Sequence, residues 1–110
     1  MALVYDLRDD HRYRLQILSQ VENQWQAYLD GKYATSISEG RIVKLFYASY
    51  EGEHMFVLDD GVNRYSWSRD PNDDRFAVGR NARVETVVFC VPQIGDMPTV
   101  TRIWLDDAGS

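Results

Sequence analysis

The sequence of 110 residues holds a single cysteine, Cys90. One cysteine excludes an internal disulfide and any metal site built from several cysteines. Cys90 stands in the apolar run 87–91, which is rich in β-branched residues and typical of a buried strand. We therefore expect a buried thiol that packs as a small hydrophobe and has little reactivity.

Long apolar runs are missing as well. No stretch of 18 apolar residues is present, which argues against a transmembrane helix. Residues 1–6 contain neither a basic segment nor an apolar run of the length that a signal peptide needs. These absences predict a cytoplasmic protein with no membrane partner.

Side chains that carry catalysis are few. His11 and His54 are the two imidazoles, and no nucleophile-elbow sequence accompanies them. His54 follows Glu53 at an expected strand end, which is typical of a polar surface histidine and not of a general base. No cofactor-binding motif is found. The sequence therefore predicts no catalytic residue, no cofactor and no enzymatic activity.

Paired aspartates are frequent, but their positions favour turns. Each pair stands at the boundary of an expected element, where Asp caps helices and accepts hydrogen bonds from turn amides. Residues 70–74 place oxygen ligands at positions one, three and five of a calcium loop. Arg75 replaces the glycine at position six, however, and Asn81 replaces the glutamate at position twelve. We predict no metal site.

The charge is acidic, with a formal net value of -5 at pH 7 and a pI of about 4.8. Such a chain repels the phosphate backbone, so nucleic acid is a disfavoured partner and a basic protein surface a better one. Five arginines and three aspartates between residues 64 and 83 still allow a modest basic patch. The length and the 45% share of hydrophobic residues predict one globular domain, residues 1–110.

Residues 54–67 read as a β-hairpin with a tight turn at Asp60-Gly61, because Asp-Gly between alternating apolar residues favours a two-residue type I′ turn. This turn predicts a register as well as a shared face. The expected cross-strand pairs are Asp59 with Val62, Leu58 with Asn63, Phe56 with Tyr65, and His54 with Trp67. The expected face carries His54, Phe56, Leu58, Tyr65 and Trp67.

The remaining elements follow from hydrophobic periodicity. An amphipathic helix is predicted over residues 10–30, with an apolar stripe that packs against the sheet and a stop at Gly31. Residues 13–29 can alternatively form a hairpin, since 13–17 alternates as a strand does. The stripe comprises Leu15, Leu18, Val21, Trp25 and Leu29. Strands are predicted over residues 41–48, 54–59, 62–68, 82–91 and 99–105, and a short edge strand near residues 3–8 is an option.

This order of elements predicts an α+β or mainly β protein: a small antiparallel sheet or partly open barrel of about five strands with one N-terminal helix. Residues 40–89 resemble the strand succession of OB-fold proteins of the cold-shock and S1 kind, with a glycine-led strand at Gly40, the Asp60-Gly61 turn, and a strand after Gly79. The resemblance implies a strand that curls round a barrel, and aromatics that stack on bases. Residues 50–56 carry acids where the cold-shock pattern is basic and rich in glycine, so nucleic-acid binding is not carried over with the shape.

The aromatic face of the hairpin is the principal candidate site. Aromatics at alternate strand positions form either half of a core or a docking surface. The candidate binding residues are Tyr47, Tyr50, His54, Arg64, Tyr65, Trp67 and Arg69.

We therefore predict a non-enzymatic interaction module, a small acidic accessory or inhibitory protein that is a monomer or a homodimer. Its partner would be another protein, which a basic surface would suit. A single-stranded nucleic-acid-binding OB-like protein is the alternative, and a small-ligand binder is the third possibility.

Overall fold

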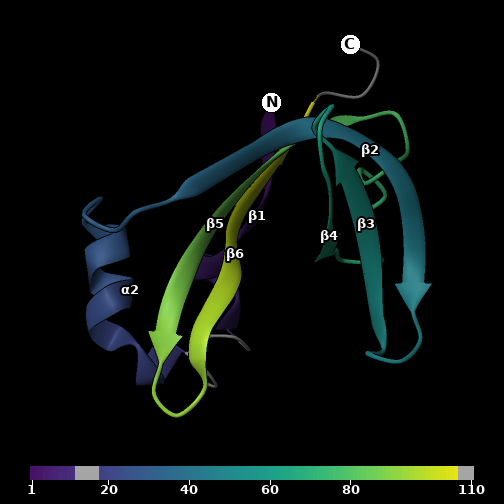
Figure 1. The fold of residues 1–110 in the computed structure, drawn as a ribbon. Coiled ribbons are helices and arrows are strands. Elements are labelled where there is room, and N and C mark those ends of the chain that lie inside the picture. The colour runs from purple at the N-terminus through teal and green to yellow at the C-terminus, as the bar shows by residue number, and fades with distance from the viewer. Residues whose placement is uncertain (12–17, 107–110) are drawn as a thin grey trace.

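The computed structural model describes residues 1–11 and 18–106, and its main feature is one antiparallel sheet of six strands in the order β1-β6-β5-β2-β3-β4 (Figure 1). The strands are β1 (Ala2–Asp6), β2 (Ser36–Ala48), β3 (Glu53–Asp59), β4 (Arg64–Ser68), β5 (Asn81–Val91) and β6 (Gly95–Leu105). The helical segments are the 3₁₀-helices η1 (Leu7–Asp9) and η2 (Leu18–Gln20) and the α-helix α2 (Glu22–Leu29). Within residues 1–11 and 18–106, the mainly β prediction with one α-helix is confirmed. The described sheet has six strands rather than about five, since the optional N-terminal strand forms as β1.

Strand β2 gives the sheet its shape because it changes partner along its length. Residues 36–41 pair with β5, and residues 41–48 pair with β3. Gly40 lies where the partner changes, and a Cβ atom there would lie 2.0 Å from the carbonyl oxygen of Asp59. Only glycine permits this close approach of two backbones. The sheet therefore bends into a half-barrel of six strands, where we predicted a small antiparallel sheet or partly open barrel of about five.

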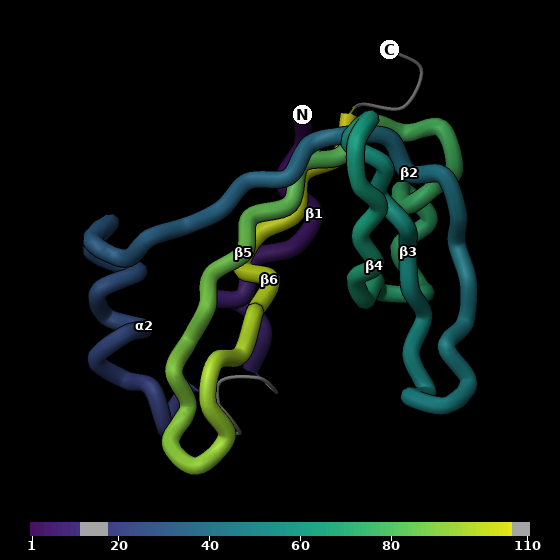
Figure 2. Tube along the Cα trace, viewed as in Figure 1, coloured from purple at the N-terminus to yellow at the C-terminus, as the bar shows by residue number. Residues whose placement is uncertain are grey.

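The bend divides the sheet into two limbs (Figure 2). We call β1, β6, β5 and the first half of β2 the helix limb, because α2 lies beside it. The second half of β2 with β3 and β4 is the hairpin limb. In Figure 1, β2 arches over the top from one limb to the other.

Two hydrophobic cores lie on opposite faces of the helix limb. On β5, Ala82 and Val84 belong to one core and Val87 and Phe89 to the other, and even and odd positions of a strand face opposite sides. The inner core, between the limbs, comprises Ile42, Phe56, Leu58, Phe76, Ala82, Val84, Ile103 and Leu105. The helix core comprises Leu7, Leu18, Val21, Trp25, Val87, Phe89 and Val91.

Among the described residues, the predicted helix over residues 10–30 is interrupted, because the 3₁₀-helix η2 precedes α2. Helix α2 covers Glu22–Leu29 and ends where Gly31 adopts a positive φ of 71°. Residues 12–17, including Leu15 of the predicted stripe and most of the first strand of the alternative hairpin, lie outside the described residues. In the described part, Leu18, Val21 and Trp25 are buried against the sheet as predicted.

Leu29 is 41% exposed and departs from the predicted stripe.

No helix among the described residues is long and apolar enough to cross a membrane.

The predicted register of the β3–β4 hairpin is wrong by two residues. Phe56 pairs with Trp67, Leu58 with Tyr65, and Asp59 with Arg64, and a four-residue loop replaces the two-residue turn. The carboxylates of Asp59 and Asp60 cause the wider loop, because they accept hydrogen bonds from the amides of residues 61, 62 and 63 at 2.6–2.8 Å. A shift of two residues preserves the side-chain faces, so the shared aromatic face is retained.

Cys90 is exposed, which corrects the expectation of a buried thiol. The neighbours Phe89 and Val91 take the buried positions of β5, and alternation turns Cys90 outward. Its Sγ lies 3.2 Å from a carboxylate oxygen of Asp96. This hydrogen bond raises the pKa of the Cys90 thiol, which lowers its thiolate fraction.

Candidate functional site

Five ring-bearing side chains of the hairpin limb lie on the face that contributes to the inner core. Cross-strand pairing arranges them in rows: Tyr47 beside His54, then Phe56 beside Trp67, with Tyr65 beside Leu58 in the next row. We call Tyr47, His54, Phe56, Tyr65 and Trp67 the inner aromatic face. The strand register, rather than a loop, fixes the positions of these side chains.

Ring contacts form two groups on this face, Tyr47 with His54, and Trp67 with Phe56 and Tyr65. The ring centroids of Tyr47 and His54 are 4.8 Å apart, and those of Phe56 and Trp67 are 5.9 Å apart. Tyr65 stacks on Trp67 at 5.4 Å with an interplanar angle of 20°. Aromatic pairs at these separations attract one another and restrict each other's rotamers. The face is therefore preorganised.

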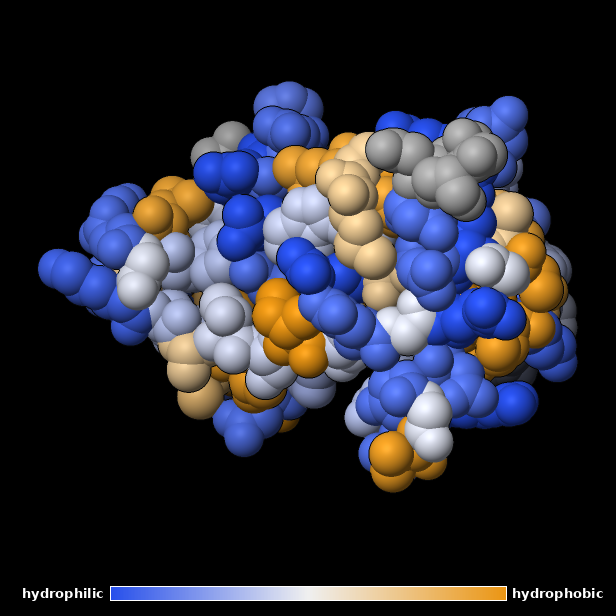
Figure 3. Space-filling view, turned by 90° about the horizontal axis from the view of Figure 1, so that it is seen from above, coloured by the Kyte–Doolittle hydropathy of each residue, from blue (hydrophilic) through white to orange (hydrophobic). Residues whose placement is uncertain are grey.

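Burial changes across this surface. Phe56 is fully buried and also contacts Phe76 from the loop after β4, at a centroid distance of 5.2 Å. Tyr65 and Trp67 are half-buried, while Tyr47 is 55% exposed. The base of the face is thus part of the inner core, and its rim is open to solvent. Seen from above, the surface is notched between the α2 side and the hairpin side (Figure 3).

Four of the seven predicted binding residues, Tyr47, His54, Tyr65 and Trp67, share this face. Tyr50 lies in the β2–β3 turn and is 99% exposed. The remaining two are arginines with other contacts. Arg64 forms an ion pair with Asp59 at 3.0 Å, and the Arg69 side chain donates to the carbonyl of Met55 at 3.1 Å.

Acidic side chains lie at the end of the hairpin limb. Glu51 and Glu53 are both exposed, one in the β2–β3 turn and one at the first position of β3. Glu53 also accepts a hydrogen bond from the hydroxyl of Ser68 at 2.5 Å. The open end of the aromatic face, at Tyr47, is therefore followed directly by carboxylates.

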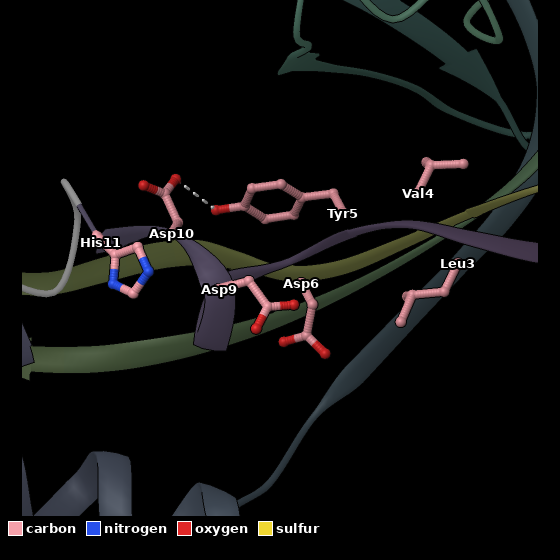
Figure 4. A pocket seen from close by; sticks show the side chains of 7 residues that line it. All are labelled: Leu3, Val4, Tyr5, Asp6, Asp9, Asp10 and His11. Atoms are coloured by element: carbon pink, nitrogen blue, oxygen red, sulfur yellow. Dashed lines mark hydrogen bonds between the residues drawn. The ribbon is translucent and has the colours of Figure 1, made fainter.

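An open cavity of about 510 Å³ runs along β1 and is not among the predicted sites. Its lining residues are Leu3, Val4, Tyr5, Asp6, Asp9, Asp10 and His11. Figure 4 shows Val4, Tyr5 and Asp10 on one side of β1, with the Tyr5 hydroxyl donating to Asp10 at 3.2 Å. The acidic run 9–10 after a short strand was the available signal.

The carboxylate of Asp6, on the other side of β1, forms an ion pair with Arg8. Its hydrogen bond from the Arg8 side chain is the main cause that lowers the pKa of Asp6, and the Arg8 amide adds to this effect. Asp6 is therefore ionised near neutral pH and held locally.

A buried polar cluster under α2 was also missed. Glu85 is only 4% exposed and accepts hydrogen bonds from Tyr28 at 2.6 Å, from Thr101 at 2.7 Å and from Arg102. Burial alone would raise the pKa of Glu85, but these donors outweigh it and leave the pKa below its usual value. The cluster ties α2 to β5 and β6, which is a structural role. A lone glutamate between Val84 and Thr86 was the signal for it.

Among the described residues, no three His, Cys, Asp or Glu side chains come together in a way that would hold a metal ion. No protein-family model matches the chain, and no curated protein sequence is significantly similar to it. The inner aromatic face is therefore the candidate site on geometric grounds.

Proposed function

We propose that this protein is a non-enzymatic interaction module, an acidic accessory or inhibitory protein that binds a protein partner at the inner aromatic face. One observation carries the proposal: two groups of contacting rings share one face, and exposure along that face rises from the fully buried Phe56 to Tyr47, which is 55% exposed. Aromatic side chains that a partner desolvates near the centre of an interface supply much of the binding energy in many complexes.

A basic segment is the partner chemistry that the surroundings favour. Glu51 and Glu53 lie next to the exposed end of the face, and Tyr50 is fully accessible in the same turn. Carboxylates attract lysine and arginine side chains, and the faces of Tyr rings bind cations. The net charge of -5 would further steer a basic partner toward the protein.

Partner capture tests the proposal. Immobilised wild-type protein and a Tyr47→Ala variant are compared for the proteins that each retains from native cell extract. We expect the variant to keep the wild-type melting temperature, because Tyr47 is mostly exposed. The amount of specific partner that it retains should be at least tenfold lower than for wild type. Ile94→Ala, at an exposed apolar position in the β5–β6 turn, is the matched control. Equal capture by wild type and Tyr47→Ala would contradict the proposal.

The Tyr65–Trp67 stack is the observation that favours the alternative, single-stranded nucleic-acid binding. The cations that this function needs are engaged elsewhere. Arg64 pairs with Asp59 and Arg83 with Glu39, while Lys44 lies over Phe46 at 5.4 Å. Oligonucleotide affinity that falls steeply with added salt would favour this alternative over a protein partner.

A further inference from the structure

The outer edge of β4 carries backbone groups directed away from the sheet. The Arg69 amide donates to His54 O at 2.9 Å, and the Asp60 amide donates to Asn63 O at 3.1 Å. With the observed register, these two bonds place Tyr65 and Trp67 in the hydrogen-bonded pairs with β3. The backbone groups of the alternate residues, 64, 66 and 68, therefore point outward. In the described part of the chain, no strand pairs with this edge.

This edge lacks the features that usually block strand addition. The β3–β4 register runs without a bulge, and residues 64–68 contain no proline. Arg64 is the only charged residue of the strand. The two residues that face inward are Tyr65 and Trp67, so an added strand would extend an aromatic surface and would not meet a buried charge.

The opposite edge of the sheet, β1, also has no second partner strand among the described residues. Val4 and Tyr5 from β1 and Trp67 from β4 pack against the same inner core. The open cavity of about 510 Å³ lies along β1 (Figure 4). The half-barrel thus has two open edges beside one core. The volume of the cavity along β1 is in the range of known ligand clefts.

We propose that an extended segment of a basic protein partner adds to β4 as a seventh, antiparallel strand. Its backbone pairs with residues 64, 66 and 68, and its inward side chains, which are apolar, contact Tyr65 and Trp67. Its side chains on the opposite face of the sheet lie beside Ser68 and beside the Glu53 carboxylate, which accepts a hydrogen bond from Ser68. A lysine or arginine fits there. This inference rests on the proposed function and names the mode of binding and the class of partner.

A capped seven-residue peptide with alternating lysine and valine is the probe. Binding is measured by NMR, from the chemical shifts and the exchange rates of the β4 amides. We expect the peptide to slow exchange of the Ser66 and Ser68 amides. A peptide with glutamate in place of lysine should bind at least tenfold more weakly.

Ser66→Pro is the decisive variant, because it removes an outward amide and leaves the bonds between β3 and β4 in place. It should bind the lysine peptide at least tenfold more weakly than wild type, while Ser66→Ala, which keeps the amide, should stay within twofold. The melting temperatures of both variants check that the fold is retained.

Three results would overturn strand addition. The first is equal binding by Ser66→Pro and Ser66→Ala, and the second is no binding of the lysine peptide to wild type at millimolar concentration. The third is concentration-dependent protection of Ser66 without peptide, which would mean that a second copy occupies the edge. If Tyr47→Ala loses its partner while Ser66→Pro keeps it, the proposed function stands without strand addition. If Ser66→Pro loses the peptide while Tyr47→Ala keeps the partner, the edge binds and the proposed role of the face fails.

Discussion

Glu85 is the residue on which the polar cluster under α2 depends. Three donors, Tyr28, Thr101 and Arg102, converge on its buried carboxylate. Glu85→Gln should lower the free energy of unfolding by about 1–3 kcal/mol, because it removes the charge that compensates Arg102 and leaves hydrogen bonds unmade. Chemical denaturation measures this loss.

The pair of Arg83 and Glu39 supplies a matched control, since both its side chains are about half exposed, 43% and 54%. Glu39→Gln should cost less than about 1 kcal/mol. Equal losses for the two variants would contradict the assigned role of the buried cluster.

The pH dependence of stability follows from the same residue. The pKa of Glu85 is lower in the folded protein than its ordinary value of 4.5, and the pKa of Asp6 is lowered as well. Their contribution to stability is therefore fully present above pH 4.5 and is lost as pH falls through the folded pKa values. Melting temperatures between pH 7 and pH 3 should fall less steeply for Glu85→Gln than for wild type. A steeper fall for the variant would reverse the predicted sign.

For single residues, the sequence predicted the face of the sheet on which a side chain lies better than the burial and the contacts of that side chain. Alternation placed Phe56, Tyr65 and Trp67 on one face correctly, because it depends only on strand geometry. The prediction that Cys90 is buried was wrong, since an apolar run does not indicate which of its alternate positions is covered. Glu85 shows the same limit, because its donors come from α2 and β6, distant in the sequence.

Strand β2 is the element that determines the architecture, and Gly40 is its critical position. A Cβ atom at Gly40 would lie 2.0 Å from Asp59 O, so Gly40→Ala forces β2 and β3 apart. We expect a loss of about 3 kcal/mol or more, which is the upper range for overpacking. Denaturant unfolding measures it.

Gly61→Ala is the control, because a Cβ atom there meets nothing within 4 Å although φ is +94°. Only backbone strain is expected at that site, at a cost of about 1 kcal/mol. A Gly40→Ala variant as stable as Gly61→Ala would mean that the close approach does not fix the bend.

The element boundaries show why hairpins are difficult to place from sequence. Asp60-Gly61 did mark the turn, but the amides of residues 61–63 bond to Asp59 and Asp60 side chains and widen the loop. Local turn statistics do not weigh such competing acceptors. The two hairpin strands were predicted within two residues of their observed bounds, whereas their cross-strand pairs were wrong. The predicted strands 41–48 and 99–105 begin later than the observed β2 (Ser36–Ala48) and β6 (Gly95–Leu105).

At the scale of the whole molecule, the half-barrel could not be predicted from local patterns. It requires that β2 pair with β5 over residues 36–41 and with β3 over residues 41–48, which is a long-range choice. The two cores, on opposite faces of β5, follow from the same arrangement. The aromatic face therefore lies opposite the side covered by α2, and no helix among the described residues packs on it.

Hydroxyl-radical footprinting of the protein, alone and in complex with its captured partner, tests whether the partner covers the inner aromatic face. We expect partner binding to lower the oxidation of Tyr47, Tyr65 and Trp67 by at least threefold and to leave the oxidation of Ile94, in the β5–β6 turn, unchanged. Unchanged oxidation of these three aromatics in a stable complex, with protection elsewhere, would contradict the assignment of the inner aromatic face as the binding surface.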